Sequence, residues 1–230
     1  MKIEVTVAAP VASVWDALRN KDKIRHWHGW EYEGGLDQEI DLIYFTDAVE
    51  EGTTLRLGNG DEFAVEPADG GSRVTLTRAP LGANPDWDAY YDDITEGWIT
   101  FLHQLRFFLE RHPGDTRHTL FYSGTGPVSP VDELRIPAGD AFELDLVGQR
   151  VKCEVWYRSD HQLGLTVDAW GNGLLVLSHV PPGDRKPDGA TMAILSLYGA
   201  VDRDVDRDAV DARWRAWWSK RWPEELNLPG

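Results

Sequence analysis

Two histidines and two tryptophans stand close together in the segment RHWHGW, residues 25–30, and such side chains could bind a metal ion or transfer protons. His26 and His28 are two residues apart, which puts them on different faces of a helix but on one face of a strand. A zinc site needs three or four ligands at matched spacing, and the five other histidines stand singly along the chain. The sequence therefore predicts no metal site, and we interpret His26 and His28 as residues of the surface or of a cavity rim.

The two tryptophans of this segment, Trp27 and Trp30, are three residues apart and can share one face of a helix. Each indole can bury up to roughly 250 Å² of surface while its N–H group needs a hydrogen-bond partner. Two interpretations stay open: both rings pack a short helix into the core, or one ring forms the lip of a cavity.

Other reactive side chains give no catalytic set. Tyr44, in DLIYFTD, is interpreted as a strand residue whose hydroxyl either serves as a polar group in a cavity or belongs to a cross-strand aromatic pair. Cys153 alternates with Val151 and Val155, which predicts a buried and inert thiol. The chain has no phosphate-binding loop, no GxSxG sequence and no dinucleotide fingerprint, so we predict no catalytic residue and no cofactor.

The overall composition excludes several classes of protein. The formal net charge of −16 repels phosphate backbones, and no run of 18 apolar residues could span a bilayer. The first residues alternate like a strand instead of forming the apolar core of a signal peptide. A single cysteine permits no internal disulfide, which suits a reducing compartment. We therefore expect a cytoplasmic protein with no nucleic-acid partner and no membrane span.

The first half of the chain has the pattern of one α+β unit. A strand with Ile3, Val5 and Val7 on one face leads into a helix near Pro10, and a second short helix ends at Gly29. Short extended runs with turn dipeptides follow and predict an antiparallel meander. A period of 3.6 then predicts a long helix over residues 94–109. Its apolar stripe includes four large side chains: Trp98, Phe101, Leu102 and Leu105.

The second half repeats this order of elements in a divergent form. A strand, a shortened helical segment, further strands and a closing helix follow one another, and RHPGD connects the halves. Trp214, Trp217 and Trp218 on the closing helix are predicted to pack in a core, although a basic, tryptophan-rich helix could also lie on a membrane. We expect two domains, residues 1–112 and residues 114–230.

The opening IEVTVAAPVASVWDAL, the segment KIRHWHGW, and GGSRVTLTRAPLG before a long helix that begins near EGW together resemble the SRPBCC (START-like, birch-pollen-allergen-like) superfamily. The resemblance is closest to proteins similar to the ATPase-activator domain of heat-shock co-chaperones. It implies an α+β helix-grip fold, in which a curved antiparallel sheet surrounds a long C-terminal helix, here in two tandem copies. In this superfamily the cavity between helix and sheet binds lipids, hormones or polyketides, and in some members it is catalytic.

From the residues and this resemblance we predict a protein without catalysis of its own. It would bind a small hydrophobic or amphipathic ligand in an unfilled space under Trp98. The predicted ligand-binding residues are Trp27, Trp30, Tyr44, Trp98, Phe101, Leu102 and Leu105. One alternative is a co-chaperone-like module that binds a chaperone and stimulates its ATPase. The other is an enzyme for a polyketide-like substrate, with Tyr44, His26 or His28 transferring a proton.

Overall fold

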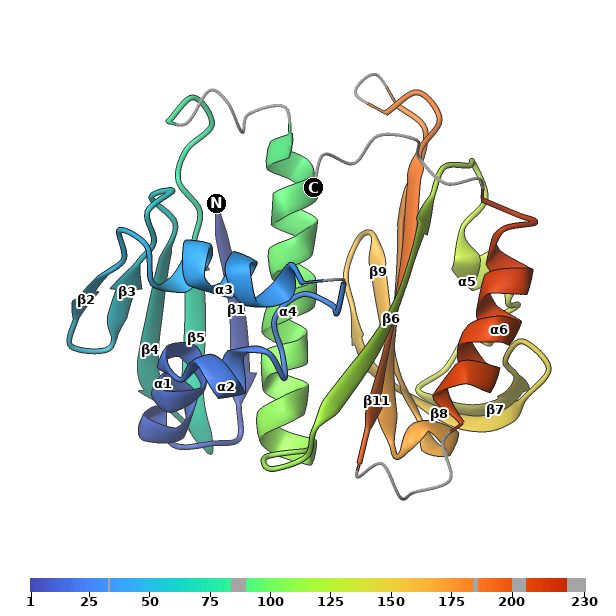
Figure 1. Ribbon diagram of the computed structural model, residues 1–230, viewed down its shortest axis with the longest axis horizontal. Helices are drawn as coiled ribbons and strands as arrows, with labels where there is room; N and C mark the ends of the chain where they lie inside the picture. The colour runs from blue at the N-terminus through green and yellow to red at the C-terminus, as the bar shows by residue number, and fades with distance from the viewer. Residues whose placement is uncertain (33, 84–89, 184–185, 200–205, 223–230) are drawn as a thin grey trace. The chain divides into compact units, whose positions relative to one another are not determined.

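The structure is a computed structural model that describes the chain except for residues 33, 84–89, 184–185, 200–205 and 223–230. It divides into two compact units, Met1–Asp115 and Thr116–Gly230. Each unit combines an antiparallel sheet with helices (Figure 1), as the α+β prediction requires.

The first unit contains a strand, three short helices, four strands and a long helix. In chain order these are β1 (Lys2–Val7), α1 (Val11–Arg19), α2 (Lys21–Ile24), α3 (Leu36–Tyr44), β2 (Val49–Glu51), β3 (Thr54–Arg56), β4 (Glu62–Ala68), β5 (Gly71–Thr77) and α4 (Tyr91–Arg111). The strands form one sheet in the order β1-β5-β4-β3-β2.

The sheet of the first unit buries one face because its sequence alternates. Ile3, Val5 and Val7 on β1 are buried, while the residues between them are exposed. In the antiparallel register Ile3 lies opposite Leu76 and Val5 lies opposite Val74 on β5. Helix α4 packs against β1 and is about 30 Å long at 1.5 Å per residue. This arrangement places the helix that carries Trp98 beside the sheet.

The second unit follows a similar order, with one short helix in place of three and with six strands among its described residues. Its elements are β6 (Arg117–Gly124), α5 (Pro130–Glu133), β7 (Ala141–Asp145), β8 (Arg150–Arg158), β9 (Gln162–Val167), the 3₁₀ turn η2 (Asp168–Trp170), β10 (Gly173–Val180), β11 (Ala190–Tyr198) and α6 (Arg207–Trp218). The strand order is β6-β11-β10-β9-β8-β7. In both sheets the first strand pairs with the last, and the meander runs back from there. The two units are thus tandem copies of one helix-grip topology.

Tryptophan side chains dominate the core of the second unit. Trp170, Trp214, Trp218 and Trp222 are almost completely buried. The indole N–H groups of Trp218 and Trp222 donate to the carbonyl oxygens of Ser123 and Val128, each at 3.0 Å. The prediction that the closing helix packs in a core is therefore confirmed for Trp214 and Trp218.

The segment around Tyr44 differs from its prediction. We interpreted it as a strand, but residues Leu36–Tyr44 form helix α3. Leu36, Ile40 and Tyr44 are the buried residues of this helix, at the four-residue spacing of one helical face. A short apolar run such as LIYF fits a strand or a helix. Here the four-residue spacing of Leu36, Ile40 and Tyr44 is that of a helix.

Candidate functional site

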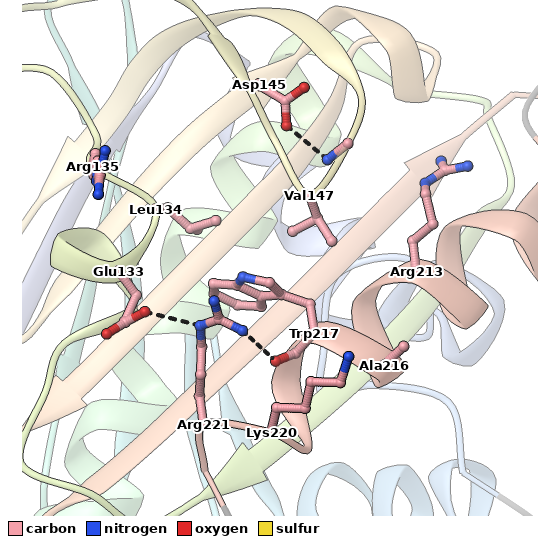
Figure 2. A pocket seen from close by; sticks show the side chains of 11 residues that line it. Glu133, Leu134, Arg135, Asp145, Val147, Arg213, Ala216, Trp217, Lys220 and Arg221 are labelled. Carbon is pink, nitrogen blue, oxygen red and sulfur yellow. Dashed lines mark hydrogen bonds and ion pairs between the residues drawn. The ribbon is translucent and has the colours of Figure 1, made fainter.

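The structure contains an open pocket in the second unit (Figure 2) and a buried cluster of aromatic and polar side chains in the first. The cluster contains most of the residues that the sequence analysis selected. It lies where the turn after α2, helix α3 and the first half of α4 meet, and we call it the His28 cluster.

The imidazole of His28 is fully buried at the centre of this cluster. Its ring centroid lies 4.5 Å from that of Phe101, 5.2 Å from that of Tyr44, and 5.9 Å from those of Trp27 and Trp98. The interpretation of His28 as a residue of the surface or of a cavity rim was therefore wrong. Trp27 is its neighbour in the sequence, but the rings of Tyr44, Trp98 and Phe101 come from α3 and α4, and the local sequence gave no sign of them.

The other histidine of the segment is less enclosed. His26 is half-buried, and its ring centroid lies 5.7 Å from that of Phe108. Gly29 follows His28 with φ +53°, and a Cβ atom there would lie 3.2 Å from Leu36. Glycine therefore permits the turn that directs His28 inward.

A chain of polar contacts leads from the surface to the buried end of the cluster. The exposed Tyr32 hydroxyl donates to Glu39 Oε2 at 3.0 Å. Glu39 Oε1 lies 3.3 Å from His28 Nε2, and His28 Nδ1 lies 2.9 Å from the Tyr44 hydroxyl, which is fully buried. Carboxylate, imidazole and phenol thus form a continuous line in which a proton could shift.

Burial and neighbouring charge set the proton affinities of this line. Burial works to raise the pKa of Glu39, but the hydrogen bond and charge of His28 and the Tyr32 hydroxyl outweigh it, so the pKa lies below its ordinary value. Burial, and then the charge of Glu39, raise the pKa of Tyr44 well above 10. Glu39 is therefore ionised and Tyr44 protonated at neutral pH.

The two tryptophans of the sequence motif have different environments. Trp27 is fully buried, and its N–H group donates to the Ala17 carbonyl at 2.9 Å. Trp30 is half-buried, with its ring 6.4 Å from that of Phe101. Trp27 therefore packs in the core, whereas Trp30 lies at the edge of the cluster.

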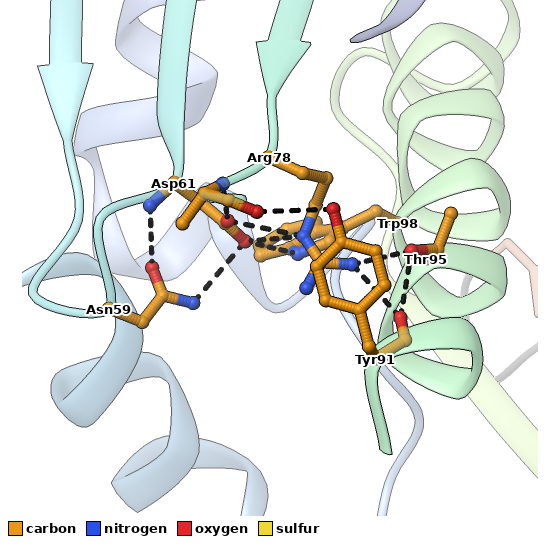
Figure 3. Close-up of polar contacts among 7 residues, drawn as sticks. Asn59, Asp61, Arg78, Tyr91, Thr95 and Trp98 are labelled. Carbon is orange, nitrogen blue, oxygen red and sulfur yellow. Dashed lines mark hydrogen bonds and ion pairs between the residues drawn. The ribbon is translucent and has the colours of Figure 1, made fainter. Parts of the chain in front are cut away.

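Trp98 is positioned by a buried ion pair that the sequence analysis did not single out (Figure 3). Its indole N–H donates to Asp61 Oδ2 at 3.0 Å, and Arg78 Nε lies 3.0 Å from the same oxygen. Arg78 also donates to Thr95 Oγ1 at 2.7 Å and stacks on the Tyr91 ring at 4.5 Å. These contacts join the sheet to α4. Asp61 belongs to the turn sequence NGD, and no signal in the sequence revealed its burial.

The space around Trp98 is occupied by other aromatic rings. Phe63 lies 5.4 Å away, Phe101 5.9 Å and Tyr44 6.4 Å, each nearly perpendicular to the indole. Leu102 and Leu105, the remaining residues of the predicted site, are fully buried. The unfilled space that we expected under Trp98 thus contains packed side chains, because α3 brings Tyr44 against the indole.

The other expectations concern a thiol, metal ligands and the membrane. Cys153 is buried beside Val151, and burial raises its pKa to about 12, as predicted for an inert thiol. In the described ranges no three His, Cys, Asp or Glu side chains converge as ligands of a metal ion would. Within the same ranges, no helix combines the length and the apolar composition needed to cross a bilayer.

Comparisons with known proteins return only distant structural likeness. No family model and no curated protein matches the chain, so neither comparison supports closeness to the co-chaperone activator domains. Three solved structures align over nearly the whole chain. DynU16, a putative protein in the dynemicin biosynthetic locus, is 17% identical over 95% of this chain and 94% of its own, with a TM-score of 0.35. The di-domain ARO/CYC StfQ from the steffimycin biosynthetic pathway is 13% identical over 94% of this chain and 92% of its own, with a TM-score of 0.35. The di-domain ARO/CYC BexL from the BE-7585A biosynthetic pathway is 13% identical over 94% of this chain and 91% of its own, with a TM-score of 0.32. These scores are low, and the helix-grip assignment rests on the strand order of the chain itself.

Proposed function

We propose that the domain of residues 1–112 binds a small hydrophobic or amphipathic molecule at the His28 cluster, between α4 and the sheet. The observation that supports this is the line from Glu39 through His28 to Tyr44, buried among aromatic rings. Burying polar groups costs free energy, and apolar side chains could fill the same space. Ligand sites characteristically combine apolar walls with a few placed polar groups.

The chemistry of the cluster suggests the class of ligand. The rings of Trp98 and Phe101 offer flat apolar contacts, and the Tyr44 hydroxyl offers one polar contact to a ligand hydroxyl or carbonyl. Because rings fill the interior, a ligand enters by displacing one of them. Trp30 is half-buried and Phe101 is 9% exposed, so these two side chains form the edge that would move.

A titration with a library of lipids and aromatic metabolites, followed by tryptophan fluorescence, tests this proposal. Saturable binding is expected. Tyr44→Phe removes only the hydroxyl and should weaken a hydroxyl- or carbonyl-bearing ligand about tenfold, as expected when one buried hydrogen bond is lost. Tyr122→Phe is the matched control, because Tyr122 is a buried tyrosine of the second unit whose hydroxyl donates to Asp211 at 2.7 Å. Equal effects of both variants, or no saturable ligand, would count against the proposal.

The same polar line favours a second candidate, an enzyme that transfers a proton to a bound polyketide-like substrate. Tyr44 is protonated at neutral pH and could donate its proton to a substrate carbonyl. Glu39 would stabilise His28 as an imidazolium, which would then return a proton to Tyr44 and become a neutral imidazole. In this case His28→Gln should abolish conversion of a poly-β-ketone while the substrate still binds. Recovery of unchanged substrate from the wild-type protein would rule this candidate out.

A further inference from the structure

The open pocket of the second unit is lined by α5 and the residue pair after it, by the turn between β7 and β8, and by the last part of α6 with the residues beyond (Figure 2). We call it the α5–α6 pocket. Its volume is about 680 Å³, within the usual range for small-molecule sites. The half-buried Trp217 forms an apolar wall together with Leu134 and Val147.

Positive charge collects in this pocket although the chain is acidic overall. Four cationic side chains line it: Arg135, Arg213, Lys220 and Arg221. They come from three separate places in the chain, after α5, within α6 and after α6. The pocket therefore has a local charge opposite to the net charge of −16.

The two carboxylates that line the pocket already have partners. Glu133 Oε2 accepts from Arg221 Nε at 2.8 Å, and Asp145 Oδ1 accepts from the Gly148 amide at 2.7 Å. Among the described residues that line the pocket, four cations against two carboxylates leave two positive charges unbalanced. Among the residues that the structure describes, no carboxylate pairs with Arg135 or Lys220. An anion would supply the missing negative charge.

Backbone strain is concentrated at the same pocket. Leu146 and Gln149 exchange backbone hydrogen bonds at 2.7 and 3.2 Å, so Val147 and Gly148 form a two-residue hairpin turn. Both central residues have positive φ, +53° and +78°, a turn in which asparagine and glycine are usual. A β-branched residue with positive φ is an outlier, and such outliers cluster at functional sites. Arg135, with φ +52°, is a second non-glycine residue with positive φ in this pocket.

We propose that the α5–α6 pocket binds a small organic anion with a flat apolar body, such as an aryl carboxylate. The unbalanced charges of Arg135 and Lys220 attract the anionic group. The indole of Trp217, on which the Arg221 guanidinium already stacks at 4.7 Å, accepts the flat body together with Val147. This site lies within the second unit and is independent of the proposed function of the first.

Binding of 2-naphthoate, measured by calorimetry and compared with 2-naphthylmethanol, tests the proposal. The two probes share a ring system and differ in charge. Saturable 2-naphthoate binding is expected, at least tenfold tighter than binding of the alcohol, and weaker as salt is added because screening reduces the attraction. Equal affinity for both probes would overturn the proposal.

Variants then locate the bound anion. Arg135→Gln with Lys220→Gln should weaken 2-naphthoate binding about tenfold. The matched control is Lys152→Gln with Arg158→Gln, which removes the same charge from exposed residues of the second unit outside the pocket. Val147→Asn should weaken binding while raising the thermal unfolding midpoint, a combination that a purely structural role would not produce. Unchanged affinity in the Arg135/Lys220 variant, or an equal loss in the control, would overturn the proposal.

Discussion

Asp61 and Arg78 hold the first unit together through charges that are almost completely removed from solvent. Their side chains are 1% and 5% exposed, and Asp61 also accepts from the Ala79 amide at 2.8 Å. Removing one partner leaves an uncompensated buried charge. We therefore expect Asp61→Asn to lower the free energy of unfolding by about 3–5 kcal/mol, measured by urea denaturation.

Two further variants separate this effect from general loss of charge. Asp61→Asn combined with Arg78→Met removes both buried charges and should cost less than Asp61→Asn alone. The exposed pair of Arg56 and Glu62, 2.9 Å apart, is the control, and its replacement by glutamines should change stability by at most about 1 kcal/mol. A loss at Asp61 no larger than in this control would contradict the assignment.

Glu39 gives a pH dependence with a definite sign. Its pKa in the folded protein lies below the ordinary 4.5, so it contributes stability above pH 4.5 and loses that contribution as the pH falls through the folded value. Glu39→Gln removes the titrating group. The difference in unfolding free energy between wild type and this variant should therefore shrink on acidification below about pH 4.5. A difference that stays constant between neutral and acidic pH would show that Glu39 does not have this role.

Single residues show where prediction from the sequence succeeded and where it stopped. The burial of Cys153 followed from its alternation with Val151, a purely local pattern. The burial of His28 depends on Glu39 and Tyr44, which are 11 and 16 residues away along the chain. No periodicity within one element carries information about such pairings.

At the scale of elements, the hairpin turn between β7 and β8 has an unfavourable backbone conformation. Val147 occupies a left-handed position that costs an L-residue with a Cβ atom about 1–2 kcal/mol. Val147→Asn should therefore stabilise the protein by about 1 kcal/mol, measured by chemical denaturation. Val147→Ala is the control, because it removes the same apolar side chain without relieving the positive φ. A gain in the alanine variant and none in the asparagine variant would exclude this cause.

Long elements were predicted better than short ones. The 3.6-residue period extends over many turns of α4, and the prediction of a helix over residues 94–109 was confirmed within Tyr91–Arg111. Helix α3 has only nine residues, and its LIYF run also fits a strand. The indication of a helix in α3 is the four-residue spacing of Leu36, Ile40 and Tyr44, which extends beyond this short run.

At the scale of the whole molecule, each unit has its own group of buried tryptophans, whose fluorescence reports on the unfolding of that unit. Trp27 and Trp98 lie in the core of the first unit, and Trp170, Trp214 and Trp218 in that of the second. If each unit unfolds as its own cooperative body, destabilising the first should split the transition. We expect Asp61→Asn to unfold in two steps by tryptophan fluorescence, with the second step unchanged in midpoint. A single unfolding transition with its midpoint at a lower urea concentration would show that the two units unfold together.

The order of elements along the whole chain predicted the repeated architecture, because each half contains a strand, a helical segment, a meander and a helix. The sequence did not predict that the interior of the first unit is occupied by rings. That outcome depends on side-chain packing between α3 and α4, which is decided only in the assembled fold.

The pairing of first strand with last strand has a consequence for synthesis on the ribosome. Ile3 meets Leu76, and Leu120 meets Leu195, so each opening strand emerges long before its neighbour exists. Until then its backbone amides and carbonyls form an open edge to which another nascent chain could add. Such distant pairings also slow folding, since the entropy of closing a long loop is lost before the favourable contacts between the strands form. Each half of this protein therefore passes through a period of vulnerability that ends only when its final strand leaves the exit tunnel.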